Sequence, residues 1–196
     1  MKKTLTQNFI EQLQADTRQI IVTLKYLRQQ DPEILLQQPG PGKWSVAQII
    51  EHLNTYGRYY LPKLREARKH SAAGAKLYFT PGVLGGYFTR SMKPRADGTI
   101  PNKMKAFKNH TPDQNIDSKT VLDEFERQEL LLLQLLNAAL NINIEKVRIP
   151  VSIAPFIKLK MGDVFAFLIA HHQRHFVQIS HVLSEVKANL QPLSKY

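Results

Sequence analysis

The chain has no cysteine among its 196 residues. This absence excludes disulfides, thiolate zinc sites, iron–sulfur clusters and cysteine nucleophiles. The chain also lacks a long apolar run. Its most apolar stretch, residues 164–170, is far shorter than the roughly 20 residues of a membrane-spanning helix. Polar side chains interrupt the basic start of the chain, which therefore does not read as a secretory leader. We expect a cytoplasmic protein that does not enter the membrane.

Signatures of several common enzyme classes are missing as well. The sequence contains no Walker loop, no nucleophile elbow and no glycine-rich dinucleotide fingerprint. Any catalytic chemistry must therefore come from other side chains, and histidine is the most promising type because seven are present.

Positive charge is abundant and unevenly placed. The net charge is +11, and residues 58–119 contain 13 Lys or Arg against 4 Asp or Glu. Such a segment is either a solvated surface or a docking face for an anionic partner or substrate. Aromatic residues interleave with the basic ones, which keeps nucleic-acid binding as an alternative. The basic residues do not share one clear helix face, and this disfavours that alternative.

Four segments show apolar residues at helical spacing: 5–30, 45–69, 119–140 and 161–187. Ser45 and Gln48 form a capping box at the start of the second segment. Asp31-Pro32 ends the first segment, and a loop through Pro39-Gly40-Pro41-Gly42 follows. Glycine and proline interrupt residues 71–117, which predict a long basic connection with short helical turns near residues 82–91.

Residues 141–160 read as irregular or briefly extended. No convincing sheet is predicted anywhere in the chain. The fold class we expect is all-α, a four-helix bundle in which residues 1–196 form a single domain and a long irregular connection joins the second and third helices.

Three of the histidines lie close together near the start of the fourth predicted helix. At about 100° per residue, His171 and His175 fall within the apolar stripe of that helix, whereas His172 lies to one side of it. Burying two adjacent imidazoles without partners is costly. A shared metal ion removes that cost, and histidines four residues apart on a helix are a recurrent ligand pair. The alternative is that both are hydrogen-bonded core histidines.

A third ligand is needed from another helix, because two ligands make a poor site. His52 is the best candidate, since it lies at the edge of the apolar stripe of the second helix. Tyr56 and Tyr59 lie on the same side and are candidates to line a pocket, although packing is their commoner use. His70, His110 and His181 lack such a setting.

Two sequence blocks resemble a known family. Residues 41–53 read PGKWSVAQIIEHL and are similar to the second-helix signature of the DinB-like superfamily, with its tryptophan, capping serine and His-Leu pair. Residues 171–179 read HHQRHFVQI and resemble its last-helix signature of two histidines four apart followed by Gln-Ile. The resemblance implies an up-down-down-up four-helix bundle and a metal site whose ligands are His52, His171 and His175.

The resemblance also implies a range of activities. Some members transfer low-molecular-weight thiols to electrophiles, and others are hydrolases of small molecules. Gln178 matches the glutamine that follows the second histidine of the pair, and we assign it to the pocket. His172 offers an alternative ligand to His171, and the long connection departs from the family pattern at the pocket mouth.

Three neutral histidines leave a coordination position open for water or substrate, as in catalytic sites. Nitrogen ligands suit zinc, nickel, copper or iron, and we expect one divalent ion, zinc or nickel. Asp16 and Glu129 lie on otherwise apolar helix faces. Either could orient a ligand histidine or act as a base, and the alternative for each is a salt bridge at the bundle edge.

The sequence therefore predicts a metal-dependent thiol transferase or hydrolase that acts on a small molecule, with a low-molecular-weight thiol as one candidate partner. A non-catalytic metal-binding or stress-response protein is the alternative, and nucleic-acid binding through the basic segment is less favoured. The sequence leaves a homodimer open.

Overall fold

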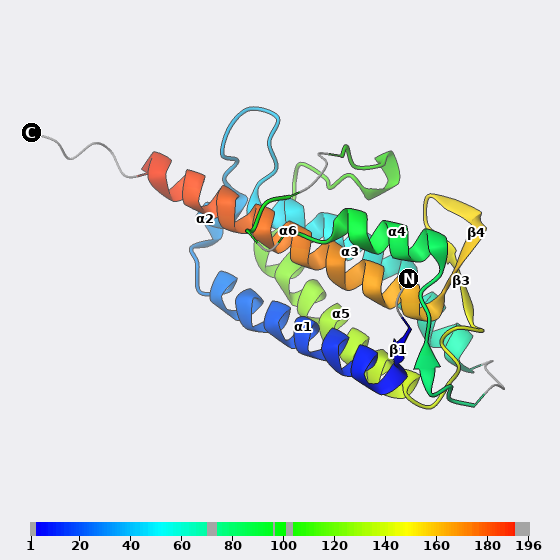
Figure 1. The fold of residues 1–196 in the computed structure, drawn as a ribbon. Coiled ribbons are helices and arrows are strands. Elements are labelled where there is room, and N and C mark those ends of the chain that lie inside the picture. Colours follow the sequence, from blue (N-terminus) through cyan, green and yellow to red (C-terminus); the bar gives the residue numbers. More distant parts are fainter. Residues whose placement is uncertain (1–2, 70–73, 96, 101–103, 191–196) are drawn as a thin grey trace, which may run out of the picture.

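Four long helices form the body of the molecule, and a computed structural model describes it over residues 3–69, 74–95, 97–100 and 104–190 (Figure 1). The long helices are α1 (Thr6–Leu27), α3 (Val46–Lys69), α5 (Ser118–Ala139) and α6 (Met161–Leu190). Helices α1 and α6 run in one direction and α3 and α5 in the other, which is the up-down-down-up order (Figure 1). The predicted all-α bundle is confirmed.

The apolar core lies where these helices meet. Helix α1 packs against α5 and α6, and α3 packs against the same two helices. Each contributes side chains that are almost fully buried: Leu24, Leu53, Phe125 and Leu168. The helical spacing of apolar residues therefore predicts the buried faces correctly, because each stripe meets two neighbouring helices. Among the described residues, no helix is long and apolar enough to cross a membrane.

The start of α3 follows the predicted capping box. The Gln48 backbone N–H donates to Ser45 Oγ at 3.2 Å, and the Ser45 backbone N–H donates to Gln48 Oε1 at 3.0 Å. This reciprocal pair satisfies two of the donors that a helix start leaves open. It also fixes where α3 begins, and therefore which way His52 faces two turns later.

Two segments are more helical than the sequence predicts. Before the predicted loop at residues 39–42 the structure has a short helix that the sequence did not predict, α2 (Pro32–Leu36), in which Asp31 caps the Glu33 backbone N–H. The long connection contains α4 (Val83–Met92), a ten-residue helix where short helical turns were predicted, and a single turn of 3₁₀ helix, η1 (Lys108–His110). Proline and glycine suppress helix propensity locally, and tertiary packing overrides that preference here.

Helix α4 is held against α6 by a buried carboxylate. Asp163, in the first turn of α6, accepts from the Gly82 backbone N–H at 3.0 and 3.1 Å, which caps the start of α4. A Cβ on Gly85 would lie 2.4 Å from the Asp163 side chain, so only glycine allows this approach. The glycines that seemed to break the helix are therefore what lets it pack.

Two short antiparallel ladders complete the fold, where the sequence predicted no sheet. Strand β1 (Thr4–Leu5) pairs with β2 (Tyr78–Phe79), so α1 begins after these two residues rather than at residue 5. Strands β3 (Arg148–Val151) and β4 (Ala154–Lys160) form a hairpin immediately before α6. The briefly extended segment expected at residues 141–160 is this hairpin.

Candidate metal centre

Three histidines from two helices converge in the interior of the bundle. His52 lies on α3, and His171 and His175 lie one turn apart on α6. The Nε2 atom of His171 is 3.3 Å from Nε2 of His52 and 3.0 Å from Nε2 of His175. All three side chains are buried, and one ligand atom of each lies within 4.8 Å of the others.

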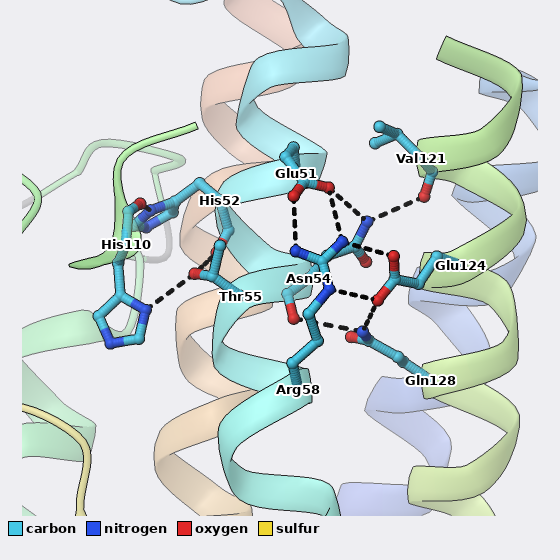
Figure 2. A network of polar contacts seen from close by, with 9 residues as sticks. All are labelled: Glu51, His52, Asn54, Thr55, Arg58, His110, Val121, Glu124 and Gln128. Atoms are coloured by element: carbon cyan, nitrogen blue, oxygen red, sulfur yellow. Dashed lines mark hydrogen bonds and ion pairs between the residues drawn. The ribbon is translucent and has the colours of Figure 1, made fainter. Parts of the chain in front are cut away.

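The tautomers of two of these rings are set by hydrogen bonds. His52 Nδ1 donates to the His110 carbonyl oxygen at 2.6 Å, as Figure 2 shows, and His175 Nδ1 donates to Gln178 Oε1 at 2.8 Å. Both acceptors lack a proton to give, so each imidazole carries its proton on Nδ1. In the neutral rings, the Nε2 atoms of His52 and His175 then each carry a lone pair that points toward His171.

The third ring cannot satisfy both lone pairs. A proton on His171 Nε2 could bond to one neighbouring nitrogen at a time. His171 Nδ1 is buried without a hydrogen-bond partner in the described part of the chain. Lone pairs that face one another in a buried site are unfavourable, and one cation among the three Nε2 atoms would satisfy them together.

The spacing of the nitrogens also fits a metal ion. Zinc–nitrogen bonds of about 2.0–2.1 Å at tetrahedral angles place two ligand nitrogens about 3.3–3.4 Å apart. The separations of 3.0 and 3.3 Å from His171 Nε2 to the other two nitrogens are close to this value, and all three ligand atoms lie within 4.8 Å of one another. The hydrogen bonds to Nδ1 are the kind that orient metal-binding histidines in proteins. These residues can therefore hold a metal ion.

Burial keeps the three rings neutral, which metal ligation requires. Desolvation lowers the pKa of His52 and lowers that of His171 well below its ordinary value. It lowers the pKa of His175 to about 3. All three are therefore unprotonated at neutral pH and able to donate a lone pair to a cation.

His110 also belongs to this cluster, although its position in the sequence does not predict it. Its backbone carbonyl fixes His52, and its ring stacks on Tyr56 with centroids 3.8 Å apart. Thr55 Oγ1 donates to the His52 carbonyl and accepts from His110 Nδ1 (Figure 2). Burial lowers the pKa of His110 to about 4, so this ring also stays neutral. The orientation of His52 thus depends on η1, within the long connection.

The profile of the DinB superfamily matches residues 10–179. The chain belongs to the DinB superfamily. The matched range includes α3 and α5 and most of α1 and α6, and it contains the three converging histidines. Comparisons with curated proteins and with solved structures each find no match. Family membership therefore agrees with the fold and the histidine cluster, and the finer function has to be argued from the site itself.

An open cavity of about 800 Å³ lies over the three histidines of this DinB superfamily member. His52, His171 and His175 form part of its wall, together with Tyr56 and Gln178. Other walls come from residues 42–44, from residues 104–107 of the long connection and from the second half of α6. A small molecule in this cavity would reach the three histidines from one side.

Of the two predicted pocket tyrosines, only Tyr56 lines the cavity. Desolvation raises the pKa of Tyr56, so its hydroxyl stays protonated and serves as a hydrogen-bond donor rather than a base. Tyr59 lies outside the cavity, where its hydroxyl approaches the Val151 carbonyl at 3.4 Å. The two residues lie about 60° apart around α3, and this offset is enough to bring Tyr59 to the hairpin while Tyr56 stays at the cavity.

Neither predicted carboxylate lines the cavity. Glu129 is buried on α5, with Oε1 2.9 Å from Nδ1 of His172 rather than beside a converging histidine. Asp16 is partly exposed on α1 and accepts from Gln12 of the same helix. The partners that orient His52 and His175 are the His110 carbonyl and the Gln178 amide, and no acid takes that position. His70 lies outside the described residues, as do Ser71–Ala73 at the start of the predicted connection.

Proposed function

We propose that this protein is a metal-dependent enzyme that transfers a low-molecular-weight thiol to an electrophile or hydrolyses a small molecule. Zinc or nickel is the ion that we propose for the site. The proposal is supported chiefly by one observation: three neutral histidine nitrogens converge at the wall of an open cavity. Structural metal sites are closed by a fourth protein ligand, whereas three histidines leave room for water or substrate.

The residues around the site would have different roles in this reaction. His52, His171 and His175 would hold the ion, and the His110 carbonyl and Gln178 would keep the ligand rings in place. A bound divalent cation lowers the pKa of water or of a thiol and so makes a nucleophile available near neutral pH. Tyr56, protonated and at the cavity wall, can donate a hydrogen bond to a substrate oxygen.

The two candidate reactions have a common form. In thiol transfer, sulfur forms a bond to an electrophilic carbon, the leaving group departs with its bonding electrons, and the thiol proton passes to solvent. In hydrolysis, a water oxygen takes the place of sulfur. Both reactions need a cavity that admits two small reactants side by side, and about 800 Å³ is within the range of small-molecule sites.

The test is turnover by the zinc-loaded and the nickel-loaded protein. One assay supplies a low-molecular-weight thiol with a chromogenic aryl halide, and a second supplies a chromogenic ester in water. We expect one of the two activities to require metal and to be lost in His171→Ala. His181→Ala is the matched control, because His181 lines the cavity but is exposed and lies outside the converging set.

Two results would contradict the proposal. Turnover that is unchanged by chelation and by His171→Ala would exclude the histidine centre as its source. Tight metal binding without turnover in either assay would instead support a non-catalytic metal-binding protein.

A further inference from the structure

A second cavity, of about 260 Å³, opens between α1, α4 and α6. It shares no lining residue with the cavity over the three histidines. Helices α4 and α6 form two of its walls, and Phe9 of α1 with Phe79 of β2 forms a third. Sites for drug-sized ligands have volumes of about 300–1,000 Å³, so this cavity suits a smaller molecule.

Asp163 places a carboxylate in the wall of this second cavity, and the residue is only 2% exposed. Desolvation raises the pKa of its carboxyl group, and the Gly82 N–H and the charge of Lys160 oppose this effect. Within the described part of the chain, Asp163 forms no ion pair and accepts hydrogen bonds from the Gly82 backbone N–H alone. Lys160 does not line the cavity, and its Nζ donates to the Thr80 carbonyl at 2.6 Å.

The carboxylate of Asp163 therefore has acceptor capacity to spare. Its two oxygens can accept about four hydrogen bonds, and one backbone N–H uses only part of that number. A buried charge is costly unless it is paired, and a cationic ligand in the cavity would supply both the opposite charge and the missing donors.

Arg90 brings the opposite charge to the same cavity. It lies in the last turn of α4, is exposed, and forms no ion pair with Asp163 or with any other acid that the structure describes. A simple amine would therefore meet one like charge, at Arg90, and a simple carboxylate would meet one at Asp163. A ligand that carries one charge of each sign satisfies both groups.

The other walls of the second cavity are apolar. The rings of Phe9 and Phe79 lie with their centroids 4.5 Å apart, and Phe79 is almost fully buried. Pro81 and Ala166 add small apolar surfaces. An aliphatic group of a few carbons can pack against these side chains, whereas a third charge would find no partner there.

We propose that the second cavity binds an α-amino acid with an aliphatic side chain. The ammonium lies on Asp163, the carboxylate on Arg90, and the side chain against Phe9 and Phe79. An ammonium has three donors and no acceptor, which suits a carboxylate with open acceptor positions, and a guanidinium pairs with a carboxylate through two N–H donors. This binding is independent of the function proposed for the three histidines.

The experiment compares L-leucine with two analogues that each lack one of its charged groups. 3-Methylbutylamine keeps the ammonium, 4-methylpentanoate keeps the carboxylate, and both keep the branched side chain. Each compound is titrated at pH 7.5 into ¹⁵N-labelled, chelator-treated protein while amide chemical shifts are recorded by NMR. Chelation prevents an amino acid from binding through a metal ion, and shifts at Gly86 and Thr89 locate the ligand in the second cavity.

Two variants each remove one of the charges. Asp163→Asn keeps an oxygen that can accept from the Gly82 N–H, so the start of α4 remains capped. Arg90→Gln removes the guanidinium. Arg18→Gln is the matched control, because Arg18 is exposed on α1 and does not line the cavity. Circular dichroism confirms that each variant is folded.

We expect L-leucine to bind on the order of tenfold to a hundredfold more tightly than either analogue, the usual value of a hydrogen-bonded charge. Asp163→Asn should remove its advantage over 4-methylpentanoate, and Arg90→Gln its advantage over 3-methylbutylamine. Arg18→Gln should leave both advantages unchanged. If Asp163→Asn fails to fold, Arg90→Gln and the two analogues decide.

The inference is overturned if L-leucine does not bind, if all three compounds bind equally, or if the shifts are confined to the cavity over the histidines. It is also overturned if either folded variant keeps the advantage that it should lose. Because the titration uses metal-free protein, its failure leaves the proposed function standing. An absence of metal-dependent turnover would in turn leave amino-acid binding standing.

Discussion

Helix α3 carries two polar networks on different sides, and they are built on different principles (Figure 2). Toward α5, Arg58 lies between two carboxylates, with its Nε 2.7 Å from Glu124 and its Nη1 2.6 Å from Glu51. Hydrogen bonds to Glu124 first, and then to Glu51, raise the pKa of Arg58. Gln128 and Asn54 add hydrogen bonds across the same helix pair. In this network, each charge faces an opposite charge.

Toward α6, the network contains neutral groups and remains incomplete. The donors of His52 and His175 are satisfied at Nδ1, but their Nε2 lone pairs face a third imidazole. The contrast teaches how to read buried polarity. The ion pairs on the α5 side are partly exposed and neutralise one another, whereas buried lone pairs that converge predict a ligand.

The largest contrast should appear in metal affinity. His175→Ala removes one of three ligands, so its affinity should fall by more than the about 10–100-fold that losing an orienting partner costs. Arg58→Met disrupts the other network and should leave metal affinity unchanged. Equilibrium titration of both variants against a competing chelator measures the difference. If both variants lose affinity equally, the two networks are not independent.

The pH dependence of stability distinguishes the networks in a second way. Burial lowers the pKa of His110 to about 4 and of His175 to about 3, against about 6.5 in the unfolded chain. Between these values the unfolded state binds more protons, so the metal-free protein should lose stability as the pH falls below about 6.5. Above that pH, these histidines cause no further change in the free energy of unfolding.

The ion-pair network should respond only at lower pH. Hydrogen bonds to Arg58 hold the pKa of Glu124 below its ordinary value, so this carboxylate stays charged while the histidines begin to titrate. Urea unfolding of metal-free protein at pH 7.5, 6.5 and 5.5 isolates the histidine contribution. A free energy of unfolding that stays constant between pH 6.5 and 5.5 would contradict the buried neutral rings.

A smaller effect on metal affinity is expected from the group that orients His175. Gln178→Ala removes the acceptor at 2.8 Å and should weaken metal binding by about 10–100-fold while the three ligands remain. The same chelator competition measures it. An affinity loss as large as that of His175→Ala would mean that Gln178 holds the ion directly.

The smallest effect should come from the start of α3. Ser45→Ala removes one half of the capping box and should lower the free energy of unfolding by about 1 kcal/mol. Chemical denaturation measures this change. Threonine keeps a hydroxyl at the cap, so Ser45→Thr is the matched control and should retain most of the stability. No destabilisation in Ser45→Ala would show that tertiary contacts alone fix the helix start.

The long helices were predictable because each buries a continuous apolar stripe. Helix α4 was predicted only as short helical turns near residues 82–91, since its stability comes from Asp163 and from glycines that allow close packing on α6. Neither feature produces a local pattern, and the same holds for strand β1, whose partner lies more than 70 residues away.

The converging histidines were predictable for a related reason, because His171 and His175 interrupt an apolar stripe at helical spacing. His110 was missed because it acts on His52 through its backbone carbonyl, a group that every residue has. A proline-rich connection with few helical signals conceals which carbonyl will reach the site. The buried ring of His110, which stacks on Tyr56, is a tertiary feature with no sequence signature.

The central claim is that three histidines hold one divalent ion, and the X-ray absorption fine structure of zinc-loaded protein tests it most directly. The account predicts three imidazole nitrogens at about 2.0–2.1 Å from zinc, and two in His175→Ala reconstituted at high zinc. A wild-type spectrum with a shell of oxygen atoms and no imidazole signal, or one unchanged in His175→Ala, would contradict it.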